Sequence, residues 1–282
     1  MQYKPNDYNT LRFVDQVGNN YLFRGGAPLQ PVPDPNNPGK CKPDPNDPNN
    51  PNKCLQVFDY EGLTKAIASA PNRPCVPPPP PSQYYLVIID LVHSSEVGEF
   101  EPAMNYFNDP QHTERKNLGQ VNLWDTNGTD VCYFNPPPGS DPEQLVATIE
   151  EWLGDPLVWR VATIRTWLEH PNQIPSGPWD PSGPEGGPIV IYVHCDGGCD
   201  RTGEMIGAYR LHHMNEAWSA VWGDQPCQRP MGCNNYRAVQ WYAFWLNQTQ
   251  GFNLQHIGVD GGCTDYHILH RICSAPDGGY LP

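Results

Sequence analysis

Two short and almost uninterrupted apolar runs constrain the fold of this chain more than any other feature. They cover residues 84–91 and 188–193 and are rich in β-branched and aromatic side chains. Such runs are typical of strands that are buried on both faces, as in a parallel sheet covered by helices. Helices are predicted at 58–70, 141–153 and 157–169. The sequence therefore predicts an α/β fold, a single domain over 1–282 with a central parallel or mixed sheet flanked by helices.

The charge balance and the pattern of apolar residues exclude several classes of partner. The chain has 17 Lys and Arg against 31 Asp and Glu, a net charge of −14, so that it repels nucleic-acid backbones. No stretch reaches the roughly 18 apolar residues of a membrane span. Without a basic and then apolar leader, a cytoplasmic location is the default. Ten cysteines, and glycosylation sequons at Asn127 and Asn247, keep a secreted or lumenal location open.

Prolines, 34 in all, concentrate in two segments that we expect to be surface insertions, at about 31–53 and 74–82. The proline spacing of the first segment is expected to exclude helix and sheet alike. We expect an extended insertion closed by a Cys41–Cys54 disulfide, and either insertion could contact an assembly partner. The alternative for the first segment is a calcium loop formed by Asp44, Asn46 and Asp47.

The candidate site directly follows the second apolar run. Residues 194–203 read HCDGGCDRTG, and a helix is predicted over 204–214. A thiol at the end of a parallel strand, a glycine-containing turn and a helix N-terminus together form an anion site, and the expected ligand is a phosphate. This field favours the thiolate of Cys195, which makes it a nucleophile. Arg201 returns beside Cys195, where its planar guanidinium can hold two phosphate oxygens.

This motif resembles the HCxxGxxRTG signature of the cysteine-dependent protein tyrosine phosphatase superfamily at every fixed position. Residues 23–28 are similar to an early strand of dual-specificity-like members, and residues 88–91 to their central strand. The aspartate before the arginine is similar to the CxxGxDRTG variant of some atypical bacterial and protist tyrosine phosphatases and of myotubularin-type lipid phosphatases. The resemblance covers most of the chain outside the proline-rich segments and implies a protein tyrosine phosphatase-like fold.

The resemblance also implies a mechanism that needs no cofactor and no metal. Cys195 attacks phosphorus to give a phosphocysteine, and a general acid protonates the leaving oxygen and then activates water. Thr202 can hydrogen-bond the thiolate, Gly198 relieves the turn, and His194 supports the loop. The phosphate-binding residues would be Asp196, Gly197, Gly198, Cys199, Asp200 and Arg201.

Three aspartates are candidates for the general acid. Asp141 comes first, because it follows strand-like residues 131–135 and precedes a helix, as the acid of the family does. Its alternative role is a helix N-cap. Asp200 comes second, because myotubularin-type loops use an aspartate there. Asp125 comes third, because it follows Trp124 as in the WPD loop of other members.

The implied activity is hydrolysis of a phosphoric monoester on a phosphorylated protein or a small molecule. Enzymes for lipid and inositol polyphosphates generally add lysines around the loop, whereas this loop carries Asp196 and Asp200 and no lysine. A single phosphate, as on phosphotyrosine or a dual-specificity protein substrate, is therefore favoured, and a phosphoinositide or inositol phosphatase remains open. The alternative function is a catalytically retired phosphatase fold that serves as a structural or binding component of an assembly.

The remaining cysteines, histidines and aromatic residues have simpler interpretations. Cys199 is expected to be a buried spectator, with a disulfide to Cys195 as the alternative. Residues 241–246 are expected to form a core helix. Two further disulfides are candidates, Cys227–Cys233 and Cys263–Cys273. The alternative for the second is a zinc site of Cys263, His267, His270 and Cys273.

Overall fold

A computed structural model describes most of the chain. It covers residues 6, 8–45, 53–70, 78, 83–93, 96–125, 156–175, 188–223, 226–227 and 231–257. The predicted helix at 141–153, nearly all of the proline-rich segment at 74–82 and the Cys263–Cys273 region lie outside these residues, and so does Asp141.

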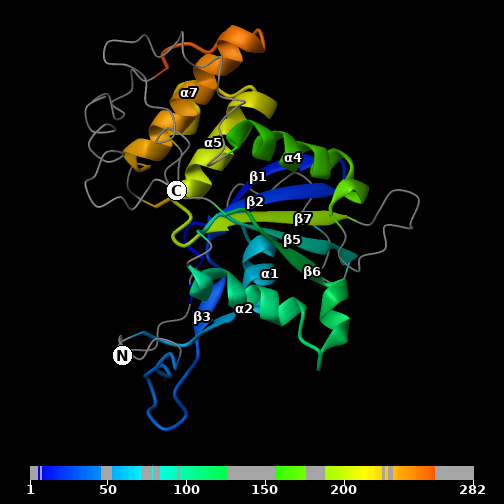
Figure 1. Cartoon of the computed structure of the whole chain (residues 1–282), viewed down its shortest axis with the longest axis vertical. Coiled ribbons are helices and arrows are strands. Elements are labelled where there is room, and N and C mark those ends of the chain that lie inside the picture. Colours follow the sequence, from blue (N-terminus) through cyan, green and yellow to red (C-terminus); the bar gives the residue numbers. More distant parts are fainter. Residues whose placement is uncertain are drawn as a thin grey trace.

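The structure has a mixed five-stranded sheet in the order β1-β2-β7-β5-β6 (Figure 1). The strands are β1 (Arg12–Val17), β2 (Asn20–Gly26), β5 (Tyr85–Asp90), β6 (Gly119–Leu123) and β7 (Ile189–Cys195). Neighbouring strands are parallel except β1, which is antiparallel to β2. The two apolar runs become β5 and β7, whose residues are all buried. The predicted α/β fold with a mixed central sheet is therefore confirmed.

Helices cover both faces of the sheet (Figure 1). Side chains alternate between the two faces along each strand, so each strand contributes residues to two apolar clusters. Ile191 and Val193 of β7 face one cluster, and Val190 and Tyr192 face the other. The first face packs against α4 (Leu157–Glu169), α5 (Arg201–His213), α6 (Trp218–Gly223) and α7 (Cys233–Thr249). The second packs against α1 (Tyr60–Ala68) and α2 (Val97–Phe107). Of the helices described, none combines the length and the apolar character needed to cross a membrane.

Two helices, α1 and α5, begin at other residues than the sequence predicted. α1 begins at Tyr60 because Asp59 is its N-cap, with a carboxylate oxygen that accepts a hydrogen bond from the Gly62 N–H at 2.9 Å. α5 begins at Arg201, three residues before the predicted start, so Arg201 and Thr202 lie in its first turn. α4 has the predicted bounds, and the aromatic run at 241–246 is part of the buried face of α7, as expected.

The described residues of the proline-rich segment pair as extended backbone, so the expectation that proline excludes sheet here was wrong. Strands β3 (Leu29–Pro31) and β4 (Gln56–Phe58) are antiparallel, and bridges beyond them join Pro33 to Cys41 and Pro43 to Cys54. The hydrogen bonds come from residues between the prolines: the N–H groups of Val32, Asp34, Lys42 and Asp44 donate to backbone carbonyls. Because prolines alternate with these donors, their missing N–H removes no bond of this pairing.

The predicted Cys41–Cys54 disulfide is present, with 5.6 Å between the Cα atoms. It joins the two arms of this extended segment, and most of the described residues between 33 and 45 are exposed. Of the suggested calcium ligands, Asp44 lies 3.9 Å from the Lys53 ammonium, whereas Asn46 and Asp47 are outside the described residues. Two short 3-10 helices, Thr113–Asn117 and Pro171–Gln173, complete the described elements.

Candidate functional site

The candidate site lies at the carboxyl end of β7, where the central strand passes into the loop 196–200 and then into α5. Cys195 is the last residue of the strand, is only 4% exposed and is a free thiol. Parallel strands place their carboxyl ends at one edge of the sheet, which is where α/β proteins bind ligands. The sequence motif therefore folds as strand, loop and helix in the predicted order.

The neighbouring strand β2 holds the loop in place. Gly198 has φ +72°, and a Cβ there would overlap the backbone of Gly25 and Gly26. The Arg24 guanidinium donates to the Gly198 carbonyl at 2.7 Å, and the Ala27 N–H donates to the Asp196 carbonyl at 2.8 Å. Arg24 is itself buried, so its charge-assisted hydrogen bond is formed away from water. These contacts fix the shape of the loop from outside the motif.

A disulfide joins the loop to the segment between α6 and α7. Cys199 is bonded to Cys227, with 5.8 Å between the Cα atoms, well within the range for a disulfide. The interpretation of Cys199 as a spectator or as a partner of Cys195 was therefore wrong, and so was the Cys227–Cys233 pairing. The cause is tertiary, because 28 residues separate the two half-cystines, and the helices that follow them, α5 and α7, pack against each other.

Several backbone N–H groups of the loop and of the first turn of α5 remain available to a ligand. Within the described part of the chain, no residue accepts a hydrogen bond from the N–H groups of Gly197, Gly198, Cys199, Arg201 or Thr202. The first regular bond of the helix runs from the Glu204 N–H to the Asp200 carbonyl at 2.8 Å. Such N–H groups, together with the positive end of the helix dipole, stabilise a bound anion.

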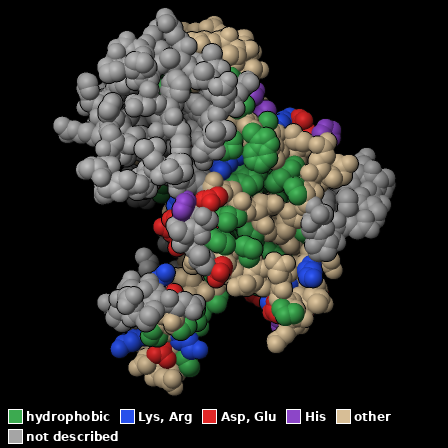
Figure 2. Space-filling model, in the orientation of Figure 1, with side chains coloured by type: hydrophobic (Ala, Val, Ile, Leu, Met, Phe, Trp, Pro, Cys, Tyr) green, Lys and Arg blue, Asp and Glu red, His purple; other side chains and the backbone are tan. Residues whose placement is uncertain are grey.

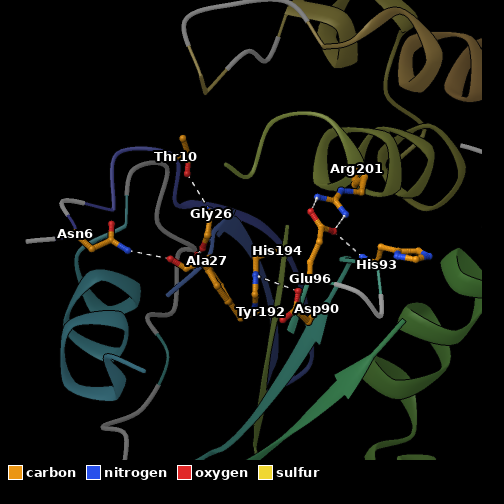
Figure 3. Close-up of polar contacts among 10 residues, drawn as sticks. All are labelled: Asn6, Thr10, Gly26, Ala27, Asp90, His93, Glu96, Tyr192, His194 and Arg201. Carbon is orange, nitrogen blue, oxygen red and sulfur yellow. Dashed lines mark hydrogen bonds and ion pairs between the residues drawn. The ribbon is translucent and has the colours of Figure 1, made fainter. Parts of the chain in front are cut away.

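Arg201 is oriented by a carboxylate that the sequence did not indicate (Figure 3). Its Nη1 lies 2.5 Å from Oε2 of Glu96, and its Nη2 lies 3.2 Å from Oε1. The His93 N–H also donates to Oε2 of Glu96, at 2.7 Å. The hydrogen bonds from Arg201 lower the pKa of Glu96, which therefore stays ionised. The bonds use one edge of the guanidinium and leave Nε and the remaining N–H groups for an anion.

Asp90 and His194 form a buried pair beneath this site, at the ends of β5 and β7 (Figure 3). The Asp90 Oδ1 lies 3.6 Å from the His194 Nδ1, too far for a hydrogen bond, and both side chains are buried. Burial, followed by the charge of Glu99, raises the pKa of Asp90 to about 8. Burial lowers the pKa of His194 to about 3. Near pH 6 both groups are therefore neutral, and the pair is not a salt bridge.

The two shifts predict an unusual dependence of stability on pH. The pKa of His194 falls from 6.5 in the unfolded chain to about 3 in the folded protein, so the unfolded chain binds more protons between these pH values. The contribution of His194 to stability therefore falls as the pH drops through this range. The pKa of Asp90 rises from 3.8 in the unfolded chain to about 8 in the folded protein, so the folded protein binds more protons between these pH values. The contribution of Asp90 to stability therefore falls as the pH rises through that range. The two oppose each other between pH 3.8 and 6.5, and Asp90 alone acts from pH 6.5 to about 8. We expect the free energy of unfolding to decline over this upper interval in urea titrations. The decline should be absent in Asp90→Asn, and its persistence there would show that another group causes it.

The structure places the other predicted site residues with different roles. The Thr202 hydroxyl is buried and has no hydrogen-bond partner among the described residues, so the expected bond to the thiol is not formed here. Asp200 accepts a hydrogen bond from the Gly232 N–H at 2.7 Å, which joins the loop to the start of α7. Asp196 is exposed at the mouth of the loop. Of the acid candidates, Asp125 is exposed after β6, and Asp141 lies outside the described residues.

Comparison with known proteins does not assign the chain to a family. No protein-family model matches it. No curated protein shows significant sequence similarity either. The resemblance to phosphatases therefore depends on the motif at 194–203, and the activity that it implies stays a prediction.

Sequence reasoning missed residues that lie far from the motif along the chain. Arg24, Glu96 and Cys227 contact the loop or Arg201, but none of them stands in a local pattern that indicates this role. Asp90 had a usable signal, because it is the one charged residue at the end of an otherwise apolar strand. A carboxylate at the carboxyl end of a parallel strand lies at the ligand-binding edge of the sheet.

Proposed function

We propose that this protein is a cysteine-dependent phosphatase that hydrolyses phosphoric monoesters through a phosphocysteine intermediate. One observation carries the proposal: a buried free thiol ends the central strand, and it is followed directly by loop N–H groups with no acceptor among the described residues and by an arginine that Glu96 orients. A nucleophile, an anion site and a cation to offset developing charge are the groups that phosphoryl transfer requires. The mixed sheet around this site agrees with a protein tyrosine phosphatase-like fold, which is part of the same proposal.

In the proposed reaction, the Cys195 thiolate attacks phosphorus in line with the leaving oxygen. An S–P bond forms and the ester P–O bond breaks, while the loop N–H groups and Arg201 stabilise the negative charge on the equatorial oxygens. The leaving oxygen takes a proton from a general acid, for which Asp141 is the first candidate. Water then attacks the phosphocysteine, inorganic phosphate leaves, and the thiolate is restored.

Glu96 is a positioning residue in this scheme. It holds one edge of the Arg201 guanidinium. Because the side chain is already fixed, Arg201 loses little conformational freedom when a phosphate binds to the other edge. The disulfide from Cys199 to Cys227 and the bond from Arg24 to Gly198 add rigidity to the loop. A site whose donors are already oriented needs little rearrangement in the transition state.

The proposal is tested with purified protein and p-nitrophenyl phosphate. We expect release of inorganic phosphate, inhibition by vanadate and, after rapid acid quench, a phosphorylated peptide that mass spectrometry locates at Cys195. Phosphate binding without any turnover would overturn the proposal and favour the alternative of a retired phosphatase fold with a binding role. Turnover without label on Cys195 would overturn the mechanism alone. A phosphotyrosine peptide belongs in the same assay, because the motif favours a single phosphate.

A further inference from the structure

A polar cavity of about 280 Å³ opens on the β2 side of the loop. Asp196 and Gly197, the two residues after Cys195, form one wall, and Glu99 of α2 lies at its edge. Further lining residues come from the N-terminal segment, from the end of β2 and from β4. Cys195 itself does not line the cavity, but the two residues that follow it in the chain do, so we assign the cavity to the leaving group of a substrate.

The N-terminal wall of the cavity is held in a defined geometry. The Asn6 amide donates to the carbonyls of Ala27 and Leu29 at 3.0 and 3.2 Å, and the Thr10 hydroxyl accepts from the Gly26 N–H at 2.9 Å (Figure 3). Thr10 thereby keeps its own proton as a donor. Asn6 and Thr10 lie on the other side of the strand ends from Arg201, with Gly26 and Ala27 near the former.

The chemistry of the lining combines donors with acceptors. Its polar side chains are those of Asn6, Asn9, Thr10, Gln56, Glu99 and Asp196. Within the part of the chain that the structure describes, the Gln56 amide and the Glu99 carboxyl make no side-chain hydrogen bond. An amide offers N–H donors and a carbonyl acceptor, whereas a carboxylate offers acceptors. A ligand that fits such a lining must itself both donate and accept at several positions.

The same lining disfavours aromatic and polyphosphorylated groups. Leu29 is the one large apolar side chain among the described residues that line the cavity, and no aromatic ring is among them. No lysine or arginine is among them either, while Glu99 and Asp196 contribute negative charge. Figure 2 shows several acidic side chains (red) on the side of this face where the strands end. A second phosphate would be repelled here, and an aromatic ring would find little apolar surface.

We propose that this cavity binds a hydroxyl-rich leaving group, so that the substrates of the site are singly phosphorylated polyols such as sugar monophosphates. The inference rests on the proposed phosphatase function and deepens it, because it names the substrate class. Each hydroxyl of a polyol both donates and accepts, which matches the mixture of amide, hydroxyl and carboxylate groups around Gln56, Thr10 and Glu99. It departs from the phosphotyrosine substrate that the motif by itself favours.

Glu99 links the cavity to the catalytic side of the site. Burial, followed by the charges of Asp196 and Glu96, raises the pKa of Glu99, and the positive charges of Lys53 and then Arg201 act against this. Glu99 thus lies within electrostatic range of both the cavity wall and the phosphate-binding arginine. A hydroxyl bonded to Glu99 would place the substrate between the two, so Glu99 and Gln56 are proposed as specificity-determining residues.

The test compares two alkyl phosphates with similar leaving groups, hexose 6-phosphate and hexyl phosphate, in kcat/KM assays of phosphate release. We expect hexose 6-phosphate to be preferred at least about tenfold, since hydrogen-bonding sites reject analogues that lack the hydroxyl. Gln56→Ala and Glu99→Gln should each reduce this preference about fivefold, the loss of one hydrogen bond. Gln30→Ala, in the strand paired with that of Gln56 but outside the cavity, is the matched control and should leave the preference unchanged.

The outcomes separate this inference from the proposed function. Two results would overturn the polyol inference: equal kcat/KM for the two alkyl phosphates, or a higher kcat/KM for a phosphotyrosine peptide or inositol hexakisphosphate. In either case, turnover of p-nitrophenyl phosphate would still support the proposed phosphatase function. If no phosphate ester is hydrolysed, calorimetry on the wild-type protein decides. Tighter binding of hexose 6-phosphate than of inorganic phosphate, reduced in Gln56→Ala, would support the cavity as a polyol site without catalysis. Equal binding of both would overturn it.

Discussion

Cys195→Ser is expected to reduce the hydrolysis of p-nitrophenyl phosphate by at least about a thousandfold, as removal of a nucleophile does in other enzymes. A hydroxyl is a much weaker acid and a poorer nucleophile than a thiol, so serine cannot replace cysteine in the attack on phosphorus. Because Cys195 is buried and free, the replacement removes no disulfide and changes little volume. The measurement is steady-state release of phosphate, with a circular dichroism spectrum to show that the variant is folded.

The control for this prediction removes sulfur elsewhere. In the double variant Cys41→Ser with Cys54→Ser, a disulfide on the exposed proline-rich segment is lost, and we expect turnover within about twofold of the wild type, as for changes remote from a site. The Cys195→Ser variant should still bind inorganic phosphate, because the N–H groups and Arg201 remain. Substantial turnover by Cys195→Ser would contradict the assignment of Cys195 as nucleophile.

Gly198→Ala is expected to destabilise the folded protein by about 3 kcal/mol and to reduce turnover strongly. Part of this cost, about 1–2 kcal/mol, comes from a φ of +72° that L-residues avoid. The rest, about 1–3 kcal/mol, comes from overlap of the new Cβ with the backbone of Gly25 and Gly26. Since backbone cannot rotate away as a side chain can, β2 and the loop must separate, and the bond from Arg24 to the Gly198 carbonyl is lost.

Gly18→Ala separates the two contributions. Gly18 also has a positive φ, +58°, but a Cβ there meets no atom within 4 Å. Only the conformational cost of about 1–2 kcal/mol then applies, and turnover should be unchanged. Urea unfolding of both variants measures the difference. Equal destabilisation by Gly18→Ala and Gly198→Ala would mean that the close approach of β2 to the loop contributes nothing.

How much of the site the sequence predicts depends on how local the cause is. The motif at 194–203 contains the thiol, the turn and the helix start, and the structure has these in the predicted order. The Arg201–Glu96 pair joins residues 105 positions apart, and the Arg24–Gly198 bond joins residues 174 apart. No spacing rule covers such distances, since they depend on how β2, β5 and β7 are ordered in the sheet.

The sequence by itself determined the elements with a clear local pattern of apolar residues, either a continuous run or a helical spacing. β5, β7 and α4 follow from such patterns, because burial on both faces or on one helical face leaves few other choices of residue. The tertiary structure alone decided which remote groups meet at the strand ends: Glu96 on Arg201, Cys227 on Cys199, and Asp90 beside His194. It also decided that a proline-rich segment pairs as extended backbone. The physical reason is that hydrogen bonds, disulfides and charge interactions act over a few ångströms in space, whereas a sequence pattern records only separation along the chain.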